Sequence, residues 1–389
     1  ALGLVPDLTA KAARTAASNA GAKVVKTFAY EISGSEQQEI YDINPDLVLL
    51  CGGTDGGNKE VIIANAKHLV AIDRPFTTIV AGNKSANDDI KAIFDEAGKD
   101  VVITANVMPQ FNKLNIEPAR DAIRQLFISR IIEAKGLNIL QSMTSYKIIP
   151  TPLAVLHACE LLSKGTKTQQ GRGDLLAVDI GGATTDVYSM ASGEPTVDNT
   201  MLKGLPEPWM KRTVEGDLGM RYSLSHVYEQ IPGSDNLENE YMQQVKAWVE
   251  LCTARPDTLA APGSEEEKLE EFLGRSAVSM AVERHCGRIA DVYTPLGLMH
   301  TQEGKDLMNV PSVIGIGGVL RNSRRPEEIL KGSLYDFMLP ECTKPRKPKF
   351  YLDQKYIFAS MGLLRSINPE LAFELLDKET VEIGCNATV

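Results

Sequence analysis

The chain has 389 residues, 43% of them hydrophobic and 24% charged, which is the composition of an ordinary globular protein with two or three domains. Its formal net charge of −10 excludes nucleic acid and anionic membranes as favoured partners. No apolar run reaches about 18 residues, as a transmembrane helix requires, and the six widely spaced cysteines include no Cys-x-x-Cys pair. We therefore expect a cytoplasmic protein with reduced thiols.

Residues 1–135 alternate between short apolar runs and amphipathic segments. The alternation predicts an open parallel sheet with helices on both faces, a Rossmann-like front domain that we assign to residues 1–145. Because Ala1 already stands at the start of a predicted strand, we expect a further segment upstream. The predicted strands are 1–5, 23–29, 46–51, 77–81 and 100–105, and the predicted helices are 8–20, 35–41, 58–70, 86–97 and 117–134.

The third predicted strand ends in a loop, Cys51–Asn58, that contains four glycines. In open α/β sheets, ligands gather at the carboxyl ends of the strands. The backbone of this loop can hold an anion, and Asp55 can hold a metal or a hydroxyl group. The alternative is a turn that faces a neighbouring domain or a partner. A helix is predicted after Asn58, so this loop is not an acid-containing phosphate hairpin.

The most informative stretch is Leu175–Met190, in which a buried strand delivers Asp179 to a turn of two glycines and two threonines before a second strand leaves. Glycines let backbone N–H groups approach phosphate oxygens, threonines add hydroxyl donors, and a carboxylate offers Mg²⁺ a hard oxygen ligand. We therefore predict a phosphate and metal site. Its catalytic and metal-binding residue is Asp179, and its cofactor-binding residues are Gly181, Gly182, Thr184, Thr185 and Asp186.

A second glycine turn follows the apolar strand Val310–Ile316 and runs into a predicted helix. Tight glycines at a strand end let a flat adenosine lie against the backbone, and a helix N-terminus favours an anion. The predicted residues of this second part of the cofactor site are Gly315, Gly317, Gly318 and Arg321.

Between the two turns, we predict a mainly helical subdomain over about residues 215–305, with residues 222–300 mostly helical. A helix over 275–290 places Arg284 and Arg288 one turn apart, where they either form surface ion pairs or stack on an adenine. The acidic run Glu265–Glu271 is typical of a solvated helix face.

The order and spacing of the two glycine turns resemble the second phosphate motif and the adenosine motif of the actin/Hsp70/sugar-kinase superfamily. Residues 151–165 are similar to the connecting helix that precedes the phosphate motif. The resemblance implies that residues 146–389 form an actin/Hsp70-like, ribonuclease H-like nucleotide-binding half with a helical insertion. It also implies that ATP or ADP binds there with Mg²⁺.

The stretches Gly3–Ala13, Leu49–Asn58 and Lys349–Asp353 extend the resemblance over essentially the whole chain. They closely resemble the glutamate mutase accessory protein family, whose members are labelled MutL or GlmL and are unrelated to the mismatch-repair protein MutL. This resemblance implies an ATP-dependent, chaperone-like reactivating factor that exchanges damaged cobalamin in an adenosylcobalamin-dependent mutase. The mutase subunits are then the expected partner.

One departure from the family pattern affects the expected ATPase activity. Members of the family carry a first phosphate hairpin near their N-terminus, and we find none in this sequence. Because positioning dominates phosphoryl transfer, we expect the chain as given to bind nucleotide better than it hydrolyses it.

Two other functions stay open at the level of sequence. The hairpin at Asp179–Val187 also resembles the hydantoinase/oxoprolinase ATPases, which activate an amide by phosphorylation but are longer and lack the front domain. The other alternative is a non-hydrolysing scaffold, in which the nucleotide only holds a shape for a partner.

Overall fold

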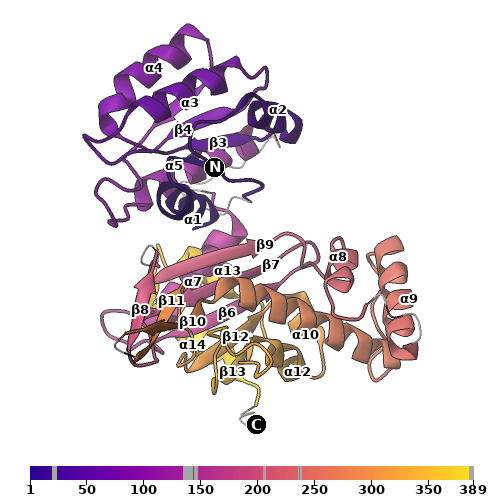
Figure 1. Ribbon diagram of the computed structural model, residues 1–389. Helices are drawn as coiled ribbons and strands as arrows, with labels where there is room; N and C mark the ends of the chain where they lie inside the picture. Colours follow the sequence, from indigo (N-terminus) through magenta and orange to yellow (C-terminus); the bar gives the residue numbers. More distant parts are fainter. Residues whose placement is uncertain are drawn as a thin grey trace. The chain divides into compact units, whose positions relative to one another are not determined.

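The computed structural model describes residues 1–19, 24–134, 143, 148–204, 207–234, 236, 239–295 and 297–384. The chain divides into two compact units (Figure 1). The first unit contains Ala1–Pro150 and Gly204–Pro206, and the second contains Thr151–Lys203 and Glu207–Val389. Each unit combines helices with a sheet, so the protein is an α/β protein, as the sequence predicts.

The first unit is built on a five-stranded sheet in the order β2-β1-β3-β4-β5. Every neighbouring pair of strands is parallel, as predicted from the alternation of strands and helices. The strands are shorter than the predicted ones, because backbone pairing covers only part of each apolar run. They are β1 (Leu2–Gly3), β2 (Phe28–Ala29), β3 (Leu47–Leu50), β4 (Thr77–Val80) and β5 (Val101–Ile103).

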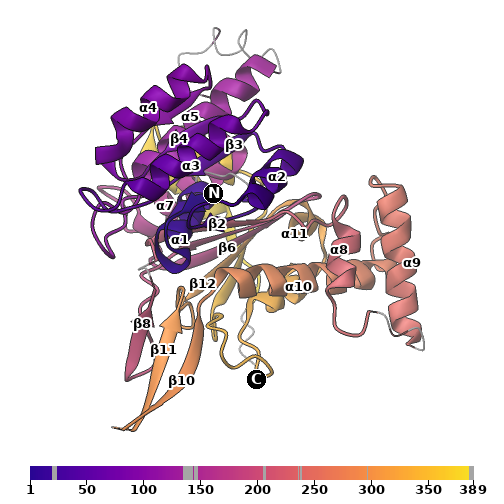
Figure 2. The ribbon, with the colours of Figure 1, turned by 45° about the horizontal axis from the view of Figure 1, so that its top comes forward.

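Helices cover both faces of this sheet (Figures 1 and 2). Leu50 and Leu49 are neighbours in β3 but belong to different cores, since successive side chains of a strand point to opposite faces. Leu50 packs with residues of α2 (Gly34–Ile43), α3 (Glu60–Ala71) and α4 (Asn87–Glu96). Leu49 packs with residues of α1 (Lys11–Asn19), which follows the π-helical turn Pro6–Ala10, and of α5 (Glu117–Ala134).

The second unit is built on a six-stranded mixed sheet in the order β14-β13-β12-β6-β7-β9. The central strands β6, β12 and β13 are parallel, whereas β7 is antiparallel to β6 and to β9. The carboxyl ends of the three parallel strands therefore lie at one edge. The strands are β6 (Leu175–Ile180), β7 (Thr185–Met190), β9 (Met210–Glu215), β12 (Ser312–Ile316), β13 (Lys349–Asp353) and β14 (Thr380–Glu382).

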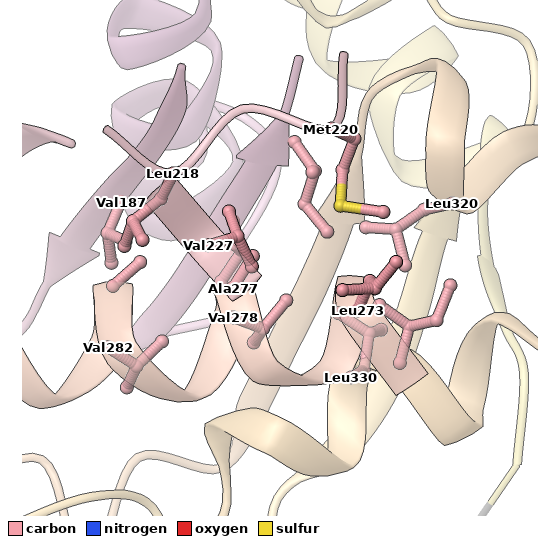
Figure 3. Close-up of a cluster of buried hydrophobic side chains, with 14 of the residues drawn as sticks. Val187, Leu218, Met220, Val227, Leu273, Ala277, Val278, Val282, Leu320 and Leu330 are labelled. Atoms are coloured by element: carbon pink, nitrogen blue, oxygen red, sulfur yellow. The ribbon is translucent and has the colours of Figure 1, made fainter. Parts of the chain in front are cut away.

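The main core of this unit lies between the mixed sheet and α10 (Glu265–His285). Figure 3 shows Ala277 and Val282 of this helix on the side of Val187 of β7 and of Leu218, whereas Leu273 of the same helix lies next to Leu320 and Leu330. The other helices with residues in this core are α8 (Leu224–Glu229), α9 (Glu240–Ala254), α11 (Gly318–Asn322) and α12 (Pro326–Leu330).

A second group of helices contains α7 (Thr151–Lys164), α13 (Phe358–Leu364) and α14 (Pro369–Glu379). Helices α7 and α13 pack closely because Gly362 has no side chain, and a Cβ there would collide with the carbonyl oxygen of Ala154. Among the described residues, no helix is long and apolar enough to cross a membrane.

Helices α8, α9 and α10 make the described part of residues 222–285 mainly helical, as predicted. A separate three-stranded sheet, β10-β11-β8, corrects the prediction for the residues after His285 (Figure 2). Its strands are β8 (Thr200–Lys203), β10 (Arg288–Thr294) and β11 (Gly297–Glu303). Helix α10 ends at His285, so Arg288 lies in a strand and is not one helical turn from Arg284. The β-branched and aromatic residues of β10 favour a strand, and Gly287 lets the chain pass close to Gly304.

We expect Gly362→Ala to destabilise the second unit by about 3 kcal/mol, since the new methyl group forces α7 and α13 apart. Urea unfolding followed by tryptophan fluorescence measures this unit, because Trp209 and Trp248 both belong to it. Gly318→Ala is the matched control, because a Cβ there meets only Asn322 Nδ2, at 3.9 Å. Equal unfolding midpoints for the two variants would contradict the expectation.

Candidate functional site

The β6–β7 hairpin places two acids opposite each other at its closed end. Asp179 pairs with Asp186, and Ile180 pairs with Thr185. The turn between them is closed by a hydrogen bond from Gly181 N to Thr184 O of 2.8 Å. Directly paired residues point to the same face of a sheet, so both carboxylates leave the face opposite to the core residues Val178 and Val187.

The carbonyl groups of Gly181, Gly182 and Ala183 are held by one neighbouring segment, Gly219–Ser223. The carbonyl oxygen of Gly181 accepts a hydrogen bond from Met220 N at 3.0 Å, and that of Gly182 accepts from Arg221 N and Tyr222 N at 2.8 Å. Ala183 O accepts from Ser223 Oγ at 2.9 Å. The turn is therefore fixed against this segment by four hydrogen bonds.

This arrangement turns three amide groups away from the supporting segment. In a trans peptide, the N–H group points opposite to the carbonyl of the preceding residue. The N–H groups of Gly182, Ala183 and Thr184 therefore point away from Gly219–Ser223, and none of them has an acceptor among the described residues. A row of free amides is the geometry that binds phosphate oxygens, so the turn fits an anion.

The structure brings the first glycine turn next to the second. Strand β12 is parallel to β6, with Ile316 opposite Asp179. The backbone at Gly317 has φ of 104°, and a Cβ at this position would lie 2.9 Å from Asp179 Oδ1. Gly317 must therefore be a glycine for both reasons, and Asp179 lies between the two turns.

Burial and neighbouring acids raise the pKa of Asp179 to about 7. Burial is the main cause, Asp186 and Asp353 add to it, and Arg212 opposes it. Among the described residues, no cationic side chain forms an ion pair with Asp179. A divalent cation at this position would supply the missing positive charge.

Three other predicted site residues are engaged inside the protein. Asp186 leaves the same face as Asp179, but it is buried, and its Oδ1 accepts a hydrogen bond from Arg212 Nε at 2.9 Å. Thr185 is buried and donates its hydroxyl to Leu218 O at 2.5 Å. Gly315 faces the core, where a Cβ would meet Leu320. These contacts hold the hairpin and the adjoining strand in place.

The remaining predicted residues lie on the accessible side. Thr184 is half-buried and donates to Asp186 Oδ2 at 3.3 Å. Gly318, the first residue of α11, and Arg321, in the last turn of that short helix, are both exposed.

One acid at this edge was missed by the sequence analysis. Asp353 ends β13, and the register places it level with Ile316, so it flanks β12 on the same face as Asp179. It is 1% exposed, burial raises its pKa, and it accepts hydrogen bonds of 3.0 Å from Ile357 N and Phe358 N. The sequence feature that could have indicated this residue is an acid at the end of a strand that follows the proposed adenosine turn.

A metal ion at this edge would lack a complete set of protein ligands. In the described part of the chain, no group of three or more His, Cys, Asp or Glu side chains can hold a metal ion. A cation beside Asp179 would therefore need water or phosphate oxygens as further ligands, which is the usual situation of Mg²⁺.

The predicted surface ion pairs of α10 are present. Arg284 donates to Glu215 Oε2 at 2.7 Å and to Asp217 Oδ1 at 2.8 Å, and it holds the pKa of Asp217 at about 2. The prediction of a solvated face is wrong at Glu271, which is 7% exposed and paired with Arg325. The pair compensates the burial of that carboxylate.

The glycine-rich loop of the first unit is held by two buried asparagines. Asn83 accepts from Gly56 N and donates to Gly57 O and Asn58 O. Asn106 donates to Gly53 O and to Asp55 Oδ1 at 3.0 Å. Asn58 Oδ1 accepts from Val61 N at the start of α3. Since side chains from two other segments bond to its backbone and to Asp55, the loop is a preformed turn.

The geometry thus defines an α/β protein with a candidate phosphate-binding hairpin. Residues 1–380 match the family model described as MutL protein. A relative named Protein MutL, from Clostridium tetanomorphum, is 46% identical over 385 residues, which cover 98% of this chain and 83% of the relative. The chain therefore belongs to the MutL family, the glutamate mutase accessory family that its motifs resemble.

Asp179→Asn tests the electrostatics of the site without any ligand. Between the ordinary pKa of 3.8 and about 7, the folded protein keeps a proton that the unfolded chain has released, so wild-type stability falls as pH rises. Asparagine resembles the protonated acid at every pH. We therefore expect the free energy of unfolding of the variant, relative to that of the wild type, to rise from about pH 4 to pH 7. The rise is at most about 1.4 kcal/mol per pH unit.

Urea unfolding in EDTA at several pH values between 4 and 8 measures this difference. A stability difference that does not change with pH would show that Asp179 titrates normally.

Proposed function

We propose that this protein is an ATP-dependent, chaperone-like reactivating factor for an adenosylcobalamin-dependent mutase of the glutamate mutase type. The observation that carries the proposal is the hairpin turn, whose amides of Gly182, Ala183 and Thr184 have no acceptor among the described residues and lie beside Asp179. Membership of the glutamate mutase accessory family supplies the expected partner. Exchange of damaged cobalamin is the activity that we assign.

We assign residues 146–389 to an actin/Hsp70-like, ribonuclease H-like nucleotide-binding half. The mixed sheet with an acid–glycine hairpin at its centre, followed by a glycine turn on the adjoining parallel strand, supports this assignment. The amides of Gly182, Ala183 and Thr184 would hold phosphate oxygens, and Gly317 and Gly318 would lie against the adenosine.

The proposed cofactors are ATP or ADP and Mg²⁺. Magnesium would supply positive charge to the phosphates and to the acid beside them. Asp179 would hold a metal-bound water or the metal itself, while Asp186 stays paired with Arg212. Exchange of ATP for ADP acts on a partner only if the two nucleotides differ in affinity for two conformations of the protein.

We assign recognition of the mutase to the front domain, residues 1–145. Its glycine-rich loop supports this assignment, because the loop is held rigidly from beneath while Gly56, Gly57 and Asn58 stay exposed. A preformed loop loses little conformational entropy when a partner binds. Because Asn83 and Asn106 already bond to polar groups of the loop, we favour a protein partner over a small anion.

Nucleotide binding is tested by thermal unfolding with and without Mg-ATP. At a hundred times the dissociation constant, ATP should stabilise the protein by about 2.7 kcal/mol. We expect Asp179→Asn to reduce the magnesium-dependent part of this gain, since it removes the charge that faces the metal. A melting temperature unaffected by millimolar Mg-ATP would contradict the proposal.

Reactivation is tested with a mutase whose cobalamin has been inactivated. We expect this protein, with ATP, Mg²⁺ and fresh coenzyme, to restore mutase activity, and Gly56→Val to weaken the effect because φ of 78° at this position strains a β-branched residue. Restoration that is equal without the protein would reject the function. ATP turnover that depends on a small amide instead would indicate an amide-activating enzyme.

A further inference from the structure

Arg221 connects two parts of the second unit that are far apart in sequence. Its backbone N–H donates to Gly182 O at 2.8 Å, inside the phosphate turn. Its guanidinium Nη2 donates to Glu270 Oε1 of α10 at 2.6 Å, and its Nη1 donates to Met220 O at 2.6 Å. One residue therefore bonds to the turn, to the segment that supports the turn, and to α10.

The stem of Arg221 also lies against the turn itself. A Cβ placed on Gly182 would be 3.7 Å from Arg221 Cβ and 3.8 Å from its Cγ. The side chain is only 14% exposed, and that of Glu270 is 21% exposed, so water competes weakly for their ion pair. The pair is thus fixed at both ends and covers the rear of the turn.

We propose that Arg221 is a positioning residue for the nucleotide phosphates, an inference that rests on the proposed nucleotide-binding function. The guanidinium of Arg221 bonds to Met220 O and to Glu270, and these bonds fix the backbone of residues 220 and 221. The N–H groups of Met220 and Arg221 are thereby placed to donate to the carbonyls of Gly181 and Gly182. Those two carbonyls set the direction of the free amides of Gly182 and Ala183. Arg221 acts on the phosphates through the turn, without touching them.

An arginine is required at this position because one side chain must donate in two directions. The planar guanidinium reaches the carbonyl and the carboxylate at the same time, whereas a lysine ammonium on a flexible stem is less well organised for this. Because Glu270 neutralises the charge of Arg221, the effect on the phosphates is one of geometry. Removing the Arg221 side chain must therefore weaken the binding of ligands that carry phosphates and leave the affinity for adenosine unchanged.

The experiment compares the affinities of ATP, ADP and adenosine, each with Mg²⁺, by isothermal titration calorimetry. We expect Arg221→Ala to weaken ATP and ADP at least tenfold and to leave adenosine within twofold of the wild type. Arg221→Lys should recover only part of the loss. A purely structural role would lower all three affinities together or would change only the melting temperature.

Arg325→Ala is the matched control, because Arg325 pairs with Glu271, the next residue of the same helix, but makes no hydrogen bond to the turn. It should lower stability without changing the ratio of ATP to adenosine affinity. Substitutions of Glu270, the ion-pair partner of Arg221, give a second test of the same inference. Glu270→Gln keeps an acceptor oxygen and should bind ATP nearly normally, whereas Glu270→Ala should reproduce Arg221→Ala.

The outcomes separate this inference from the proposed function. If the wild type binds ATP and both Arg221→Ala and Glu270→Ala keep its ratio of ATP to adenosine affinity, the inference is overturned and the nucleotide function stands. If the wild type binds neither ATP nor ADP, both are overturned.

Discussion

The register of the β6–β7 hairpin is the constraint on which the rest of the second unit depends. Pairing Asp179 with Asp186 sends both acids to one face, and it sends Val178 and Val187 to the other, where α10 covers them. The same register leaves four residues, Gly181–Thr184, to close the turn. The apolar core beneath α10 and the polar edge of the sheet thus follow from a single alignment of two strands.

This edge of the sheet carries an electrostatic cost that the described residues only partly relieve. Asp179, Asp186 and Asp353 lie near one another, and Arg212 is the cation that pairs with one of them. Burying acids without counter-charge is unfavourable, and such groups are typical of sites that bind a ligand of opposite charge. The hydrogen bonds from the start of α13 to Asp353 reduce this cost without removing it.

The regular features of the fold could be predicted from local sequence, because they depend on local patterns. The parallel sheet of the first unit follows from alternating apolar runs and amphipathic helices, and the hairpin follows from an acid and two glycines between two apolar strands. The strand pair β10–β11 was missed because apolar residues in a short segment fit a helix and a strand almost equally well.

The parts of the site that escaped the sequence analysis depend on long-range pairing. Arg212 reaches Asp186 across 26 positions, and Arg221 reaches Glu270 across 49. No local pattern distinguishes these arginines from solvated ones. Asp353 becomes a neighbour of Asp179 only because β12 lies between their strands.

The segment Gly219–Ser223, which holds the turn by its carbonyls, restricts the length of the turn. Because consecutive carbonyls of the turn bond to consecutive donors, an inserted or deleted residue would break every bond at once and would turn the following strand over. Side chains in the turn can therefore vary where space allows, whereas its length cannot. Across homologous chains, this stretch should align without gaps, while the loops elsewhere on the surface differ in length.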